Sequence, residues 1–209
     1  WCSGDKVQYE YIVNWISNMI KGGKNQSLLY AKSWTQGIGK STLTDFLMNY
    51  VVGRTLSIQS SASVLTTQNN YCLFGKLFVV FEELASSKSE WAKMASTLCE
   101  WVTSDIVRYS EKYMIGFDGT HINYKFIANI IHRYIVNTNT EAIKNSAGRR
   151  YFICDLSTKY KGKTDYWDDL HDTCFNDETG KAFYLYMCER DITGYNSSCY
   201  PMTARKKES

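Results

Sequence analysis

The chain has 209 residues, 44% of them hydrophobic, and a formal net charge of +3 at pH 7. That length and apolar content suffice for one sizeable core, and so small a charge excludes a bulk basic field as the basis of nucleic-acid binding. Seven scattered cysteines without a C-x-x-C pair argue against a disulfide framework or a zinc site.

No apolar run approaches the length that spans a bilayer, and the N-terminus lacks the order of a signal peptide. We therefore expect an intracellular protein, in the host cytoplasm or nucleus if it is viral, that is neither secreted nor bound to a membrane. The start at Trp1 also suggests a piece of a longer polypeptide.

The first predicted elements are a helix, a strand and a second helix. Apolar residues at positions 12, 15, 16, 19 and 20 recur with helical spacing, and residues 28–31 read as a short buried strand. Residues 41–50 again have helical spacing. The loop between the strand and the second helix therefore places backbone N–H groups where they can bind an anion.

This loop carries a glycine-flanked Gly-Lys-Ser sequence that is typical of nucleoside-triphosphate binding. Gly37 and Gly39 let the main chain curl around the β-phosphate, Lys40 neutralises the β and γ oxygens, and the Ser41 hydroxyl ligates Mg²⁺. Trp34 stands where the full pattern has a further glycine. The predicted binding residues for ATP are Gln36, Gly37, Ile38, Gly39, Lys40, Ser41 and Thr42.

Farther along, strands and helices alternate, which predicts an α/β fold. We expect three layers, a central, mainly parallel sheet with flanking helices, and an inserted β-hairpin. The expected strands are 54–58, 77–81, 106–114, 122–127, 133–137 and 151–156, the two in the middle forming the hairpin, and the expected helices are 91–102, 166–175 and 182–188.

Two carboxylates, Glu82 and Glu83, directly follow the apolar run 77–81. Ligands of open α/β sheets collect at the carboxyl ends of strands, where the phosphate loop also lies. An ATPase needs one group there to hold the Mg²⁺ shell and another to polarise water, so we assign these roles to Glu82 and Glu83; a solvated acidic turn is the alternative.

Further polar groups follow the later strands. Asn139, with Asn137 as its competitor, could sense the γ-phosphate, although both also suit a turn. Arg149 and Arg150 precede the strand 151–156, and either could stabilise transition-state charge on a neighbouring subunit's γ-phosphate. The alternative is a pair of surface arginines beside an edge strand.

The order of these motifs resembles that of the superfamily 3 helicases, particularly those fused to primases in phages, mobile elements and large DNA viruses, including the poxvirus type. Residues 36–41 resemble their Walker A loop, 77–83 their Walker B strand, 135–139 their sensor strand and 148–152 their arginine-finger strand. Residues 103–108 with 112–113 resemble the segment before the DNA-contacting hairpin, and 190–192 with 200–204 resemble the end of the viral modules.

The resemblance implies an AAA+-like P-loop NTPase, a homo-oligomeric ring, expected to be a hexamer, with ATP between subunits and single-stranded DNA in the pore. A primase domain in the same polypeptide is also implied. For DNA contact we favour Arg108 and Lys112, then Lys125, because pore loops need cations that follow phosphates. Tyr109, Tyr113 and Phe117 could stack on bases or pack within the hairpin.

The expected organisation is an N-terminal helix in residues 1–24, an ATPase core in 25–160, and a helical segment with a tail in 161–209. Two other functions stay open. A P-loop kinase for a small molecule or nucleotide would use the same loop but needs an acceptor site. A non-enzymatic ATP-binding module for assembly or DNA loading would fit the departures at Trp34 and Glu82.

Overall fold

The computed structural model describes residues 1–32, 35, 37–67, 69–82, 88–104, 106–109, 126–129, 133–138, 150–154 and 156–203; at 32, 62, 88–92, 106–108, 126–129 and 133–138 it describes the backbone alone. Its centre is a five-stranded sheet in the order β2-β3-β6-β1-β7, with every pair parallel. The strands are β1 (Leu28–Lys32), β2 (Ser57–Ser61), β3 (Phe78–Glu82), β6 (Arg133–Thr138) and β7 (Tyr151–Cys154).

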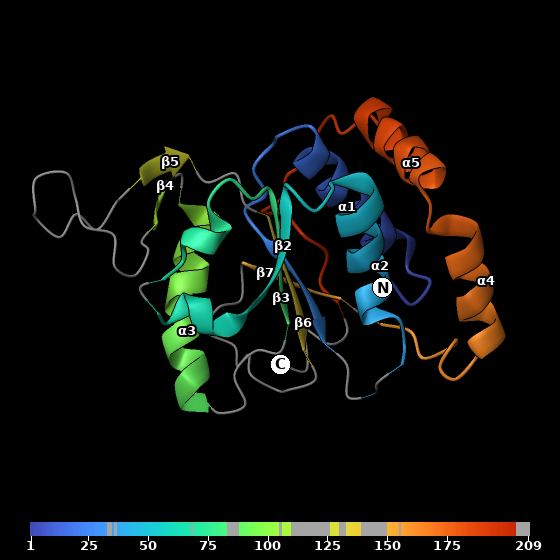
Figure 1. Ribbon diagram of the computed structural model, residues 1–209, viewed down its shortest axis with the longest axis horizontal. Helices are drawn as coiled ribbons and strands as arrows, with labels where there is room; N and C mark the ends of the chain where they lie inside the picture. Colours follow the sequence, from blue (N-terminus) through green and yellow to red (C-terminus); the bar gives the residue numbers. More distant parts are fainter. Residues whose placement is uncertain are drawn as a thin grey trace, which may run out of the picture.

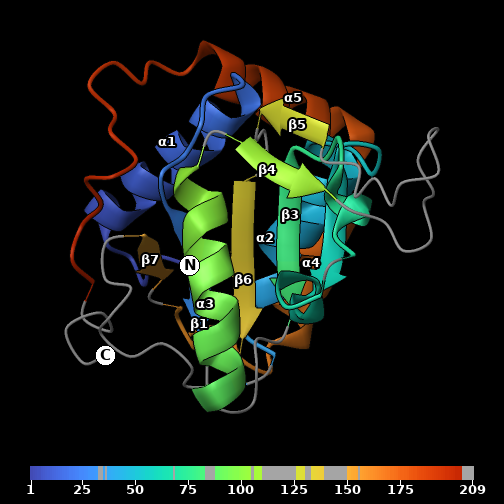
Figure 2. The same cartoon turned by 90° about the vertical axis from the view of Figure 1, so that its left-hand side faces the viewer.

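Two apolar clusters, one on each face, cover this sheet. Along β1, Leu28 and Tyr30 belong to the cluster that contains α3 (Lys88–Thr103), whereas Leu29 belongs to the cluster that contains α1 (Lys6–Ile20). Successive strand residues point to opposite faces, so a strand buried on both sides reads as a continuous apolar run. Figures 1 and 2 show the sheet between these helices, and the predicted α/β class is confirmed.

Helix α1 confirms the first predicted helix. The Asp5 side chain accepts hydrogen bonds from the backbone N–H groups of Val7 and Gln8 and so caps the N-terminus. Trp15 is fully buried on the apolar face, and its Nε1 donates to the Ser27 carbonyl at 2.9 Å. The helix is therefore attached to the chain that enters β1.

The predicted helix 41–50 and strand 54–58 both differ in detail. The helix is α2 (Lys40–Phe46) followed by a π-helical turn, η1 (Leu47–Val51), which packs against α5 (Asp177–Glu189). Strand β2 begins at Ser57 because the three residues before it form a turn, in which the Leu56 N–H donates to the Gly53 carbonyl. Periodicity alone does not distinguish this turn from a strand.

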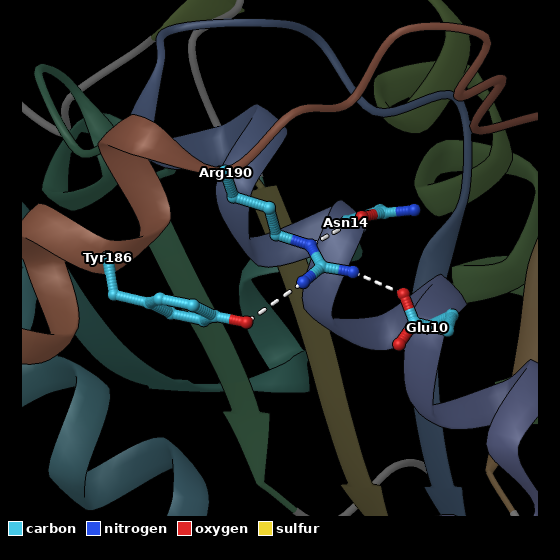
Figure 3. A network of polar contacts seen from close by, with 4 residues as sticks. All are labelled: Glu10, Asn14, Tyr186 and Arg190. Carbon is cyan, nitrogen blue, oxygen red and sulfur yellow. Dashed lines mark hydrogen bonds and ion pairs between the residues drawn. The ribbon is translucent and has the colours of Figure 1, made fainter.

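The C-terminal region consists of α4 (Thr164–Cys174), α5 and the segment that follows α5. Figure 3 shows how α5 is tied to α1: the Arg190 guanidinium donates to Asn14 at 2.7 Å and to the Tyr186 hydroxyl at 3.0 Å, and it pairs with the Glu10 carboxylate. Ser197, beyond α5, accepts a hydrogen bond at its carbonyl from the Tyr11 hydroxyl at 2.8 Å.

A second, smaller sheet pairs β4 (Ile106–Tyr109) with β5 (Phe126–Asn129) in antiparallel register. It lies beyond one end of α3 (Figure 2). Residues 110–125 lie outside the described part, so the inserted hairpin stays a prediction. Two short 3₁₀ turns, Ala62–Leu65 and Tyr71–Leu73, complete the described elements. Among these residues, every helix is too short or too polar to cross a bilayer.

Candidate functional site

The predicted phosphate loop joins the end of β1 to the start of α2. Gly37 and Gly39 have φ angles of 72° and 80°, a left-handed conformation that glycine adopts without the steric cost that a Cβ would bring. Gly39 is the N-cap residue of α2, and no side chain caps that end of the helix. The helix terminus thus has the character of an anion site, because its first N–H groups have no intrahelical acceptors.

The floor of the loop is packed against the sheet. Ile38 is 8% exposed and forms a small apolar cluster with Ala31 of β1 and Leu156, just after β7. In the first turns of α2, the buried Thr44 hydroxyl donates to the Ser41 carbonyl at 2.9 Å. These contacts hold the loop against the sheet.

The polar residues that follow the loop, at the start of α2, lie nearer the surface. Ser41 is exposed, and Lys40 and Thr42 are half-buried. Lys40 is the first residue of α2, where a cation and the helix N–H groups would face the same anion. Gln36 and Trp34 lie outside the described residues.

Two tryptophans from distant parts of the chain cover Gly39. The Trp1 indole Nε1 donates to the Gly39 carbonyl at 3.4 Å. Trp167 of α4 lies so close that a Cβ on Gly39 would stand 2.3 Å from its Cη2 atom. Figure 1 shows α4 beside α2 and the chain's N-terminus. Nothing in the local spacing of the sequence points to these contacts, which connect residues far apart along the chain.

Glu82 lies at the carboxyl-terminal end of the parallel strands, the same end of the sheet as the predicted phosphate loop. It ends β3, and its register partner is Asn137 of β6, which also pairs with Ala31 of β1. Two strand spacings, about 10 Å, therefore separate the β3 and β1 backbones at this end. By alternation from the α3-facing Phe81, Glu82 belongs to the face that α2 covers. The half-buried Glu82 and the loop are thus brought together.

Arg150 lies at the opposite end of the sheet, where the parallel strands begin. Its carbonyl accepts a hydrogen bond from the Leu28 N–H at 2.9 Å, at the start of β1. The five residues of β1 separate it from the phosphate loop by about 16 Å. Its Nε atom is buried without a hydrogen-bond partner. Arg150 is therefore too far from its own loop to contact a phosphate there.

Several predicted site residues cannot be placed. The backbone of Arg108 lies in β4, opposite Ile127, but its side chain is not described. The residues outside the described ranges are Gln36, Glu83, Lys112, Lys125, Asn139 and Arg149.

The stacking role suggested for Tyr109 is wrong. Its side chain is 1% exposed, and its ring meets the edge of Phe74 at a centroid distance of 5.4 Å. Burial also raises the pKa of its hydroxyl. Tyr109 therefore packs within the core, and a base could not reach its ring face. Of the two roles that the sequence left open, base stacking and packing, the structure supports packing, because the Tyr109 ring points into the core from β4.

A family model described as "Family of unknown function (DUF5906)" matches residues 32–150, which include the phosphate loop and most of the central strands. No curated protein matches the sequence.

Solved structures with the same fold include three of the C-terminal region of NrS-1. An apo A-form structure of that region has a TM-score of 0.74 and 17% identity, covering 98% of this chain and 47% of that one. An apo structure of residues 305–718 has a TM-score of 0.72 and 17% identity, covering 95% and 46%. A further A-form structure of the same residues has a TM-score of 0.68 and 19% identity, covering 98% and 46%. The chain thus spans about half the length of these proteins, and the likeness is one of fold.

Proposed function

The chain belongs to the DUF5906 family, and we propose that it is the ATP-hydrolysing motor of a viral or mobile-element replication helicase of the superfamily 3 type. One observation carries the proposal: a loop with two left-handed glycines, Gly37 and Gly39, opens α2 at the end of the sheet where Glu82 also lies. The similarity in fold to the NrS-1 C-terminal region and the order of motifs along the chain support it.

ATP is the proposed substrate of this site. The loop N–H groups and Lys40 hold the β- and γ-phosphates, and Gln36 and Thr42 border them. Ser41 and Glu82 would hold Mg²⁺, a hard cation that prefers such oxygen ligands, and the ion would neutralise charge on the phosphate oxygens. Glu83 accepts a proton from the water that attacks the γ-phosphorus, while the bond from that phosphorus to the β–γ bridging oxygen breaks and ADP leaves. Asn139 hydrogen-bonds the γ-phosphate.

The arginine that completes the site comes from a neighbouring copy. Arg150 lies at the end of the sheet away from its own loop, so a nucleotide that its guanidinium contacted would belong to another subunit. Arg149 is the second candidate. Hydrolysis would therefore depend on assembly of a homo-oligomeric ring, proposed to be a hexamer.

Within this ring the DNA contact falls to the β4–β5 region. Arg108, Lys112 and Lys125 would follow the phosphates of single-stranded DNA, and the hydrolysis cycle would move them. A primase in the same polypeptide would place the motor at a replication fork. Cation–phosphate contacts of this kind are strongly salt-dependent, so DNA stimulation should weaken as salt rises.

The decisive experiment mixes two inactive variants. Lys40→Ala removes phosphate neutralisation, and Arg150→Ala removes the proposed donated charge, so each variant alone should lose at least about 10³-fold in ATP turnover. In a mixed assembly, an intact loop meets an intact arginine at some interfaces, and activity should return. The assay is phosphate release with single-stranded DNA; Arg149→Ala is measured in parallel.

Three outcomes would contradict this function. Full activity of a dilute monomer would exclude a site shared between copies. Phosphoryl transfer to a small acceptor, without stimulation by DNA, would indicate a kinase. Glu83→Gln separates a working site from an inert binding module, because it should abolish turnover and retain ATP binding; an unchanged low turnover would indicate the module.

A further inference from the structure

Residues 156–167, here called the strap, begin and end on the phosphate loop. At one end Leu156 packs against Ile38, and at the other Trp167 lies on Gly39. The Trp167 Nε1 also donates to the Tyr160 carbonyl at 2.9 Å, which closes the strap on itself. The sequence between these ends is therefore held beside the proposed nucleotide site.

The strap carries a stacked pair of aromatic rings. Tyr160 and Tyr166 lie with centroids 3.9 Å apart and planes inclined by 16°, and Tyr166 meets the Trp167 ring edge-on at 5.0 Å. The Trp167 ring therefore lies between Tyr166 and Gly39, and Tyr166 remains 37% exposed. Parallel, partly exposed rings offer a surface on which a flat heteroaromatic base can stack.

Cations surround the same rings. Lys159 and Lys163 place their Nζ atoms 5.1 Å and 5.4 Å from the Tyr160 ring centroid. Both are exposed, as is Lys161, and none of the three forms an ion pair with a described carboxylate. An anionic ligand with an aromatic group would match this combination of charge and stacking.

We propose that the strap binds the base of the nucleotide whose phosphates the loop holds. The inference rests on the proposed function, because it needs a triphosphate at Gly37–Gly39 to bring a base within reach of Tyr166. Stacking on Tyr166 positions the base, and the neighbouring lysines balance the charge of the phosphate next to the ribose.

The charges of α4 favour a mononucleotide over a nucleic-acid strand. Its exposed side includes four carboxylates, Asp165, Asp168, Asp169 and Asp172. A strand that continued past Tyr166 along α4 would bring its phosphates against these carboxylates, which repel a polyanion. A single nucleotide ends at its base and avoids them.

The test compares two ligands on the full chain by calorimetry: a non-hydrolysable ATP analogue and inorganic tripolyphosphate. Tyr166→Ala should weaken analogue binding by roughly 5- to 150-fold, the range for one stacked base, and leave tripolyphosphate binding unchanged. Tyr166→Phe should retain analogue binding. Tyr184→Ala, which removes a similarly exposed tyrosine from α5, is the matched control and should change neither.

Other results overturn the inference. Equal loss of both ligands would mean that Tyr166 supports the loop only, and loss of neither would mean that the base lies elsewhere. Weaker binding of a dT oligonucleotide, with analogue binding unchanged, would assign the strap to DNA. Lys40→Ala tests the premise separately: it should weaken both ligands, and unchanged binding would refute the phosphate loop itself.

Discussion

Replacing Gly39 by alanine tests whether α4 is packed on the phosphate loop. Alanine in the left-handed conformation costs about 1–2 kcal/mol. The new Cβ would also stand 2.3 Å from Cη2 and 2.8 Å from Cζ3 of Trp167, so the ring must move. Overpacking of this kind adds about 1–3 kcal/mol. We therefore expect Gly39→Ala to lower the free energy of unfolding by about 2–5 kcal/mol, a large share of a domain's stability.

Gly37→Ala is the matched control. Gly37 has a similar φ of 72°, but nothing lies within 4 Å of its added Cβ, so only the conformational cost of about 1–2 kcal/mol applies. The entropy change of the unfolded chain is the same for both variants and cancels in the comparison.

Urea unfolding followed by circular dichroism measures the free energies, and a double-mutant cycle with Trp167→Ala isolates the clash. In the Trp167→Ala background, the cost of Gly39→Ala should fall to that of Gly37→Ala. Equal costs of the two glycine substitutions in the wild-type background, or no relief on removing Trp167, would refute the packing of α4 on the loop.

Two further predictions concern α1. Arg190→Ala should lower the free energy of unfolding by about 1–3 kcal/mol, mainly through the Asn14 hydrogen bond, because the Arg190 side chain is only 15% exposed. Glu10 is 56% exposed, so Glu10→Gln should cost less than about 1 kcal/mol, and urea unfolding would contradict this reasoning if the order were reversed. Hydrogen bonds from the Gln8 backbone N–H, then the Gln8 side chain, lower the pKa of Asp5. Its contribution to stability is therefore present above the unfolded pKa, about 4, and lost as the pH falls through the lower folded value. The melting-temperature difference between wild type and Asp5→Ala should shrink in that acidic window; a constant difference would count against the capping charge.

Local pattern was enough to predict most elements. Helical spacing at residues 12–20 predicted α1, and the unbroken apolar run 77–81 predicted β3, because periodicity and burial leave a direct trace in neighbouring residues. Element boundaries differed where a turn has the residue pattern of a strand: the strand predicted at 54–58 begins at Ser57, after a turn. The buried Tyr109 shows the same limit for side chains: its residue type suits stacking, but only its position in β4 decides which way the ring points.

By itself, then, the sequence determined the α/β class, the glycine loop before α2 and the carboxylate that ends β3, since each is a short motif between recognisable elements. The tertiary structure decided which of these groups meet. The parallel sheet, in the order β2-β3-β6-β1-β7, places Glu82 at the end where the loop lies and Arg150 at the opposite end. The tertiary fold also packs Trp167 of α4 on Gly39. These two residues are 128 positions apart in the sequence, so no local pattern predicts their contact. Strand order and such contacts depend on long crossovers and on the packing of distant faces, which spacing within one segment does not encode.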